Sequence, residues 1–149
     1  MVIENIKEKT IRGFVTRTTN KDEMNPATSK IASLWQKFDD IVDVDYKNGN
    51  RVYGVYFNYE SDANGEFTVL AGTDQAEIHN DELLESITIE SGKYLTFHAT
   101  GEIPEIVIET WGKVWQYFSK DDAKYKRTYK TDFEHYLNQN EIKVYIAIE

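Results

Sequence analysis

The chain has 149 residues and a net charge of −9, because 26 Asp and Glu outnumber 17 Lys and Arg. This length predicts one domain over residues 1–149, and the negative charge, which repels phosphate, argues against direct nucleic-acid binding. Cysteine is absent, which excludes disulfides and thiolate chemistry, and residues 1–10 lack a signal-peptide core, so we expect a cytoplasmic protein without a membrane partner.

Hydrophobic periodicity near the N-terminus predicts a strand followed by a helix. Residues 10–18 alternate between two faces, as a strand does. The pair Asn25-Pro26 combines a good N-cap with the residue preferred at the first helical position, so the helix is predicted to begin there. One apolar face at helical spacing follows, formed by Ile31, Leu34, Trp35 and Phe38.

Two Asn-Gly pairs divide the next part of the chain into strands. The first pair, Asn48-Gly49, predicts a hairpin turn between strand-like residues 41–46 and 51–59. The second pair leads into a further strand over residues 67–72.

The second half of the chain predicts the same kinds of element again. Residues 86–90 look extended, and residues 93–99 alternate as a strand. Pro104 is predicted to open a helix that continues to Phe118. Two strands follow, at residues 127–137 and 141–148.

The order strand, helix, strand, strand therefore occurs twice, in pseudo-repeats over residues 9–73 and 86–149. Trp35 and Trp115 occupy the same position in the two predicted helices, within the matching runs L-W-Q-K-F and V-W-Q-Y-F. The predicted fold is α+β, a duplicated βαββ unit with an antiparallel sheet, two main helices and a cleft between the halves. A seam between two such halves is a natural ligand site.

Catalytic and metal-binding signatures are missing from the sequence. No Gly-rich phosphate loop, His-Glu-x-x-His run or Gly-x-Ser-x-Gly elbow occurs. The histidines, His79, His98 and His135, lie far apart in the chain. We therefore expect no metal and no cofactor, and the motifs alone assign no residue a catalytic role.

Aromatic residues gather around carboxylates in two predicted strands and one helix. Residues 53–59 contain four aromatics, and residues 128–137 read T-Y-K-T-D-F-E-H-Y-L, in which strand alternation places Glu134 and Tyr136 on one face. A cation over an aromatic ring gains about 0.5–2 kcal/mol, and a carboxylate among rings loses water and favours a cationic partner. The competing interpretation is that these are half-buried strand residues beside a surface carboxylate.

The last strand has an unbroken aliphatic face that must pack against the helices, formed by Ile142, Val144, Ile146 and Ile148. Its other face offers Tyr145 beside small and charged residues. Together with the aromatics of the other segments, this gives the candidate ligand-binding set Glu134, Trp111, Tyr136, Tyr56, Tyr145 and Trp115.

Four segments also carry a family resemblance: Y-G-V-Y-F-N-Y-E-S-D-A-N-G-E-F-T-V-L-A-G (53–72), G-E-I-P (101–104), T-W-G-K-V-W-Q-Y-F (110–118) and D-F-E-H-Y (132–136). In this order they resemble the GyrI-like small-molecule-binding domain, which is the effector-binding domain of AraC- and MerR-type transcription activators and also occurs alone. The resemblance implies a duplicated βαββ fold with a ligand cleft between the halves. It also implies small ligands that are often lipophilic cations.

The resemblance gives Glu134 the place of a buried glutamate in that cleft, and it makes Trp111 and Tyr136 lining residues. The last strand in the family usually carries an acidic residue and a proline. Lys143 and Ala147 stand in those places here, which leaves the charge at the edge of the cleft, and hence the ligand preference, open.

Regulators of this family carry a helix-turn-helix domain ahead of the effector domain, whereas only about ten residues precede the first predicted strand here. We therefore expect a stand-alone binding protein for lipophilic cations. Two alternatives stay open: a hydrolase of reactive electrophiles in which Glu134 is the base, and a module that modulates a protein partner such as gyrase.

Overall fold

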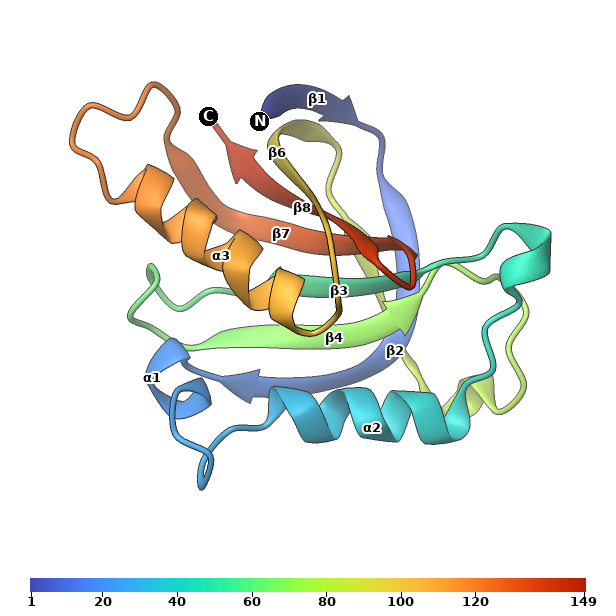
Figure 1. The fold of residues 1–149 in the computed structure, drawn as a ribbon. Coiled ribbons are helices and arrows are strands. Elements are labelled where there is room, and N and C mark those ends of the chain that lie inside the picture. Colours follow the sequence, from blue (N-terminus) through green and yellow to red (C-terminus); the bar gives the residue numbers. More distant parts are fainter.

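The computed structural model describes residues Met1–Glu149, which form one antiparallel sheet with two long helices on one of its faces (Figure 1). The helices are α1 (Asn20–Glu23), α2 (Ile31–Ile41) and α3 (Glu105–Phe118). The strands are β1 (Val2–Ile6), β2 (Lys9–Thr18), β3 (Val52–Phe57), β4 (Phe67–Thr73), β5 (Glu85–Ile89), β6 (Gly92–Thr100), β7 (Arg127–Asn138) and β8 (Glu141–Ile148). Even the longest helix, the 14-residue α3, is too short to cross a lipid bilayer.

The sheet confirms the predicted duplication. Its strand order is β1-β6-β8-β7-β3-β4-β2-β5. In each half the strand before the helix lies outermost of three, so β3-β4-β2 in one half corresponds to β7-β8-β6 in the other. The central strands β3 and β7 pair with each other and join the halves.

Strands β1 and β5 exchange between the halves. Strand β1 pairs with β6, and β5 pairs with β2. Ile6 pairs with Gly92 and Lys9 pairs with Ile89, so the two ladders share one register. The sequence did not predict β1, whose residues are mostly exposed and do not alternate clearly between apolar and polar.

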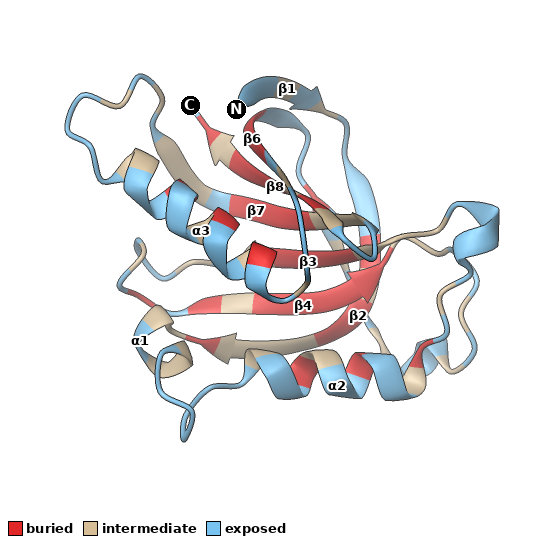
Figure 2. Ribbon diagram, in the orientation of Figure 1, coloured by how far each residue is buried: buried red, intermediate tan, exposed pale blue.

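The core lies on both faces of the sheet. Helix α2 covers a cluster that includes Phe14 and Val69, and α3 covers one that includes Val144 and Ile146. A third cluster, which includes Tyr94 and Phe133, lies on the opposite face. Figure 2 shows the central strands as the most continuously buried part of the chain. The predicted aliphatic face of the last strand is therefore confirmed.

Helix α2 begins at Ile31, so the predicted start at Asn25-Pro26 is wrong. The side chain of Asn25 instead accepts a hydrogen bond from the backbone N–H of Ala27 and holds a turn. The cap of α2 comes from Glu23, whose carboxylate accepts from the backbone N–H groups of Lys30 and Ile31. A cap from outside the helical segment leaves no local sequence signal.

The predicted strand over residues 41–46 is also wrong. Ile41 is the last residue of α2, and Tyr46–Asn48 forms a 3-10 turn that ends at Gly49 with a φ of +87°. Val42 is buried with the helix. The apolar residues in this segment therefore complete the helical face rather than begin a strand, and the Asn-Gly pair ends a 3-10 turn rather than a hairpin.

The face opposite the helices makes stability depend on pH through His135. Its ring stacks on Tyr53 with centroids 4.5 Å apart, and burial, assisted by Lys9, lowers the pKa of His135 to about 4. Below the ordinary pKa of 6.5, His135 binds a proton in the unfolded chain but stays neutral in the folded chain. The contribution of His135 to the free energy of unfolding therefore decreases as the pH falls from 6.5 towards 4.

We expect His135→Gln to remove this contribution. Urea unfolding at pH 7 and at pH 5 measures the loss of stability between the two conditions, and the loss should be smaller in the variant than in the wild type. Equal losses in both proteins would show that His135 is not buried in its neutral form.

Candidate functional site

Two adjacent cavities lie between the helices and the sheet. The main cavity has a volume of about 930 Å³ and is lined from both helices and from β3 and β7. The side cavity has a volume of about 290 Å³ and lies along α3, from Val107 to Trp115. The residues that line both are Ile31, Tyr56, Val107 and Ile108. A molecule in one cavity therefore lies directly beside the other.

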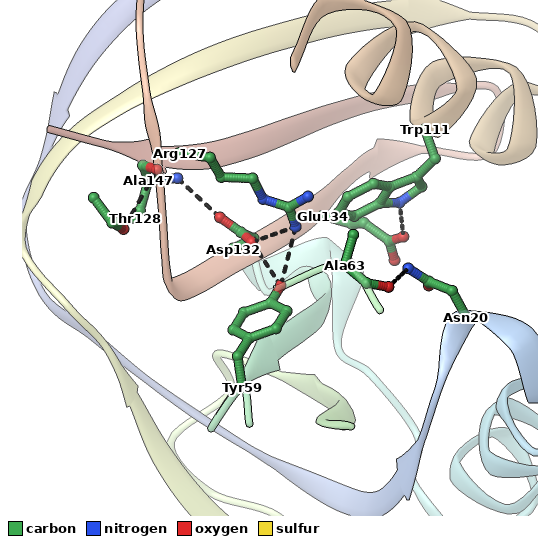
Figure 3. Close-up of polar contacts among 9 residues, drawn as sticks. All are labelled: Asn20, Tyr59, Ala63, Trp111, Arg127, Thr128, Asp132, Glu134 and Ala147. Atoms are coloured by element: carbon green, nitrogen blue, oxygen red, sulfur yellow. Dashed lines mark hydrogen bonds and ion pairs between the residues drawn. The ribbon is translucent and has the colours of Figure 1, made fainter. Parts of the chain in front are cut away.

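Glu134, on β7, supplies a carboxylate to the main cavity, and this residue is only 1% exposed. Its Oε2 accepts from the indole Nε1 of Trp111 at 2.6 Å and from the hydroxyl of Tyr56 at 2.9 Å. Its Oε1 accepts from the hydroxyl of Tyr136 at 2.9 Å. Figure 3 shows the indole nitrogen pointing at the carboxylate. The donors replace lost water but are all uncharged.

No cationic side chain forms an ion pair with Glu134; the six ion pairs of the structure all lie elsewhere. Burial raises the pKa of Glu134, while the hydrogen bonds from Trp111, Tyr136 and Tyr56 hold the rise in check. The site is thus a desolvated carboxylate without a counterion. A ligand that brings a positive charge would supply what the protein lacks.

The duplicated fold accounts for this arrangement. The offset that aligns Trp35 with Trp115 also aligns Tyr56 with Tyr136 and Gly54 with Glu134. The two equivalent tyrosines each donate to one carboxylate. The halves therefore surround a single acid with matching donors from both sides.

Gly54 is the residue that sequence reasoning missed at the centre of the site. It is the direct cross-strand partner of Glu134, and a Cβ at this position would collide with Glu134 Oε1 and press against Trp35. The absence of a side chain on β3 therefore makes the space in which the carboxylate lies. The signal in the sequence was the single glycine in a strand of large residues.

Each of the two tyrosines that donate to Glu134 packs against a tryptophan. The ring of Trp35 meets Tyr136 edge-on with centroids 5.5 Å apart, and the ring of Trp111 meets Tyr56 at 5.0 Å. The sequence assigned Trp35 to the core of α2, but it lines the main cavity. Edge-to-face contacts of this kind fix ring orientation, so the hydroxyl donors to Glu134 are held in place.

A second polar cluster, formed by Arg127, Asp132 and Tyr59, borders the side cavity. The sequence predicted the strand that carries Arg127 and Asp132 but not the cluster. Arg127 Nη2 donates to Asp132 Oδ2 at 2.8 Å and to the Tyr59 oxygen at 3.3 Å, and Tyr59 donates to Asp132 Oδ2 at 2.6 Å (Figure 3). Burial alone would lower the pKa of Arg127, but Asp132 and Tyr59 outweigh it and raise that pKa. Arg127 therefore stays charged beside its buried partner.

The structure brings five of the six candidate residues together. Glu134 and Tyr136 line the main cavity, Trp111 and Trp115 line the side cavity, and Tyr56 lines both. Trp115 is 45% exposed and stands at the rim.

The expectation for Tyr145 needs correction. Strand alternation turns its side chain to the face away from the helices, where its ring stacks on Phe133 with centroids 4.4 Å apart. Tyr145 lines neither cavity. It belongs to the core of the opposite face and not to the candidate site.

The two departures from the family pattern lie outside the main cavity. Lys143 pairs with Glu4 of β1 at 3.9 Å and lines neither cavity. Ala147 donates its backbone N–H to Asp132 Oδ1 at 2.9 Å, a bond that a proline could not make. Lys143 is therefore not one of the charged residues that line the main cavity. No three His, Asp or Glu side chains come together as a metal site.

The fold and the candidate site agree with an effector-binding protein, and comparison with known proteins shows the family. Residues 2–148 match the family of integron-associated effector binding proteins, and the chain belongs to that family. It is 42% identical to the integron cassette protein VCH_CASS2 from the mobile metagenome of Vibrio cholerae, with a TM-score of 0.88 over 99% of this chain and 95% of that one.

Two further proteins are similar to this chain. YobU of Bacillus subtilis (strain 168), named as a candidate transcriptional regulator, is 30% identical over 99% of this chain and 96% of its own length. The structure of SAV2435 bound to tetraphenylphosphonium has the same fold, with a TM-score of 0.72 at 17% identity over 99% of this chain and 93% of that one. The resemblance to the GyrI-like effector-binding fold is thereby confirmed.

The hydrogen bonds to Glu134 make a measurable prediction. Replacement of Trp111 by Phe removes a donor that favours the carboxylate form, so the pKa of Glu134 should rise further. A carbon-13 NMR titration of the glutamate carboxyl groups measures it, and Tyr145→Phe on the opposite face is the matched control that should leave it unchanged. A wild-type Glu134 that titrates like an exposed glutamate would contradict the observed burial.

Proposed function

We propose that the main cavity binds lipophilic organic cations as effectors. The observation that carries the proposal is the carboxylate of Glu134, which is buried among uncharged donors and has no cation of its own. An ionised carboxylate out of water is costly unless a positive charge accompanies it. A bound cation would therefore gain from the acid more than it would from an exposed one.

The walls of the cavity support the lipophilic part of the proposal. Most of the lining is hydrophobic, with Trp35, Tyr56 and Tyr136 around the acid. Ring faces attract cations and also cover flat apolar groups. A volume of about 930 Å³ lies at the upper end of the range for drug-sized ligands.

Two further observations agree with a cationic ligand. The net charge of −9 draws cations towards the protein. SAV2435, which shares the fold, has a solved structure in which it is bound to the lipophilic cation tetraphenylphosphonium. In this proposal residues 1–149 act as one effector-binding domain in the cytoplasm, and no cofactor takes part.

The first test compares charge at constant shape. Tetraphenylphosphonium should quench the tryptophan fluorescence of the wild type on binding, and Glu134→Gln should weaken its affinity by about tenfold or more, because the amide keeps the shape but not the charge. Triphenylphosphine oxide, which is neutral, should lose much less affinity in the same variant.

Equal losses for the cation and the neutral compound would sink the charge argument. Mass spectrometry of electrophilic ligands after incubation with the protein completes the experiment. Recovery of the unchanged ligand supports a binding protein, whereas a hydrolysed product would support the alternative of a hydrolase with Glu134 as base.

The pH dependence of binding gives a second test. Tetraphenylphosphonium has no titrating proton, so any change of affinity with pH comes from the protein. Since burial raises the pKa of Glu134, affinity should fall as the pH drops through that raised pKa, where the carboxylate becomes neutral, and should be constant at pH values well above it. Glu134→Gln should show no such fall.

Asp39 provides the matched control for this titration. It is the other carboxylate that lines the main cavity, and burial and Asp40 raise its pKa as well. Because Asp39 is exposed at the rim, Asp39→Asn should keep the pH dependence of the wild type. A profile that flattens in Asp39→Asn and persists in Glu134→Gln would place the cation at the rim instead.

A further inference from the structure

The side cavity is lined by the guanidinium of Arg127, which a cation bound at Glu134 would not need to contact. The side chain of Arg127 is 7% exposed and lines this cavity. All of its hydrogen bonds pass through Nη2, which donates to Asp132 and to Tyr59. Its Nε is buried and has no hydrogen-bond partner. Arginine usually meets a carboxylate with two parallel hydrogen bonds, so this guanidinium keeps spare donors.

An irregularity of β7 brings the guanidinium to this place. Arg127 and Asp132 are separated by an odd number of positions, so in a regular strand their side chains would point to opposite faces. Between them the pairing with β8 slips, since β8 advances only from Ile148 to Ile146. Tyr129, inside the slip, has a φ of +55°. Bulges of this kind redirect side chains beside functional sites.

Aromatic rings surround the redirected guanidinium. Its central carbon lies 4.4 Å from the ring centre of Tyr129, 5.7 Å from that of Tyr59 and 5.9 Å from that of Trp111. Trp111 is also the indole that donates to Glu134. One tryptophan therefore contacts the anionic group of the main cavity and the cationic group of the side cavity.

We propose that Arg127 forms a second subsite that binds a carbonyl oxygen of the effector, so that the preferred ligand is a lipophilic cation carrying an ester, amide or ketone. The inference rests on the proposed function of Glu134. A neutral oxygen suits the subsite because Asp132 already balances the charge of Arg127 at 2.8 Å. A carboxylate on the ligand would also meet repulsion from Asp132 and Glu134.

The test uses pairs of triphenylphosphonium cations that differ in one group. In each pair one alkyl arm ends in a methyl ester, and the other is a hydrocarbon arm with the same number of heavy atoms. Over a series of arm lengths, at least one ester should bind the wild type about tenfold more tightly than its hydrocarbon partner, the gain expected for a hydrogen bond to a charged group.

Arg127→Lys is the decisive variant. Lysine can still pair with Asp132, but its single nitrogen cannot place donors at the positions of Nε and Nη1 as a guanidinium does. The ratio of ester to hydrocarbon affinity should fall to near one. Arg12→Lys, outside both cavities, is the matched control and should keep the ratio of the wild type. Glu134→Gln should weaken both cations together and also keep it.

A wild-type readout covers the case in which Arg127→Lys does not fold, as judged by circular dichroism. The nitrogen-15 NMR signal of Arg127 Nε–H should shift more with the ester than with the hydrocarbon cation. If the hydrocarbon cation binds but no ester is favoured, or if the ratio survives in Arg127→Lys, the subsite is wrong and the proposed function stands. If neither cation binds, both the proposed function and the subsite are wrong.

Discussion

The site depends on one electrostatic constraint: the carboxylate of Glu134 is buried away from water and has no ion-pair partner. Three neutral donors hold Glu134 in place and replace its hydration. They do not remove its charge, and burial raises its pKa as a result. The protein alone cannot relieve this cost, but a ligand with a positive charge can. In this account the apolar walls select for lipophilic molecules and the acid selects for charge.

Duplication of the fold is what makes such a constraint stable. Two equivalent strands, β3 and β7, pair at the junction of the halves and place equivalent residues opposite each other. Two acids at this position would repel, and two glycines would leave an empty apolar space. Gly54 and Glu134 divide the position between them, and Tyr56 and Tyr136 approach the one acid from the two repeats. The candidate site thus lies where the repeats differ.

Local patterns predicted most of the fold and part of the site. Strand alternation placed Glu134 and Tyr136 on one face, as the structure confirms. Alternation also turned Tyr145 away from the aliphatic face that packs under the helices. Its inclusion among the ligand residues was wrong because the cavity lies on the helix side.

The features that the sequence did not reveal depend on contacts between distant segments. The start of α2 is set by Glu23 from outside the helix. The place of Arg127 is set by a slip in the β7–β8 pairing that no residue pattern marks. Gly54 acquires its importance only when β7 lies beside it. The most direct measurement of the central claim is a crystal structure with tetraphenylarsonium, whose arsenic gives an anomalous signal. We predict an arsenic peak in the main cavity beside the Glu134 carboxylate. A peak elsewhere, with this cavity free of the cation, would contradict the account.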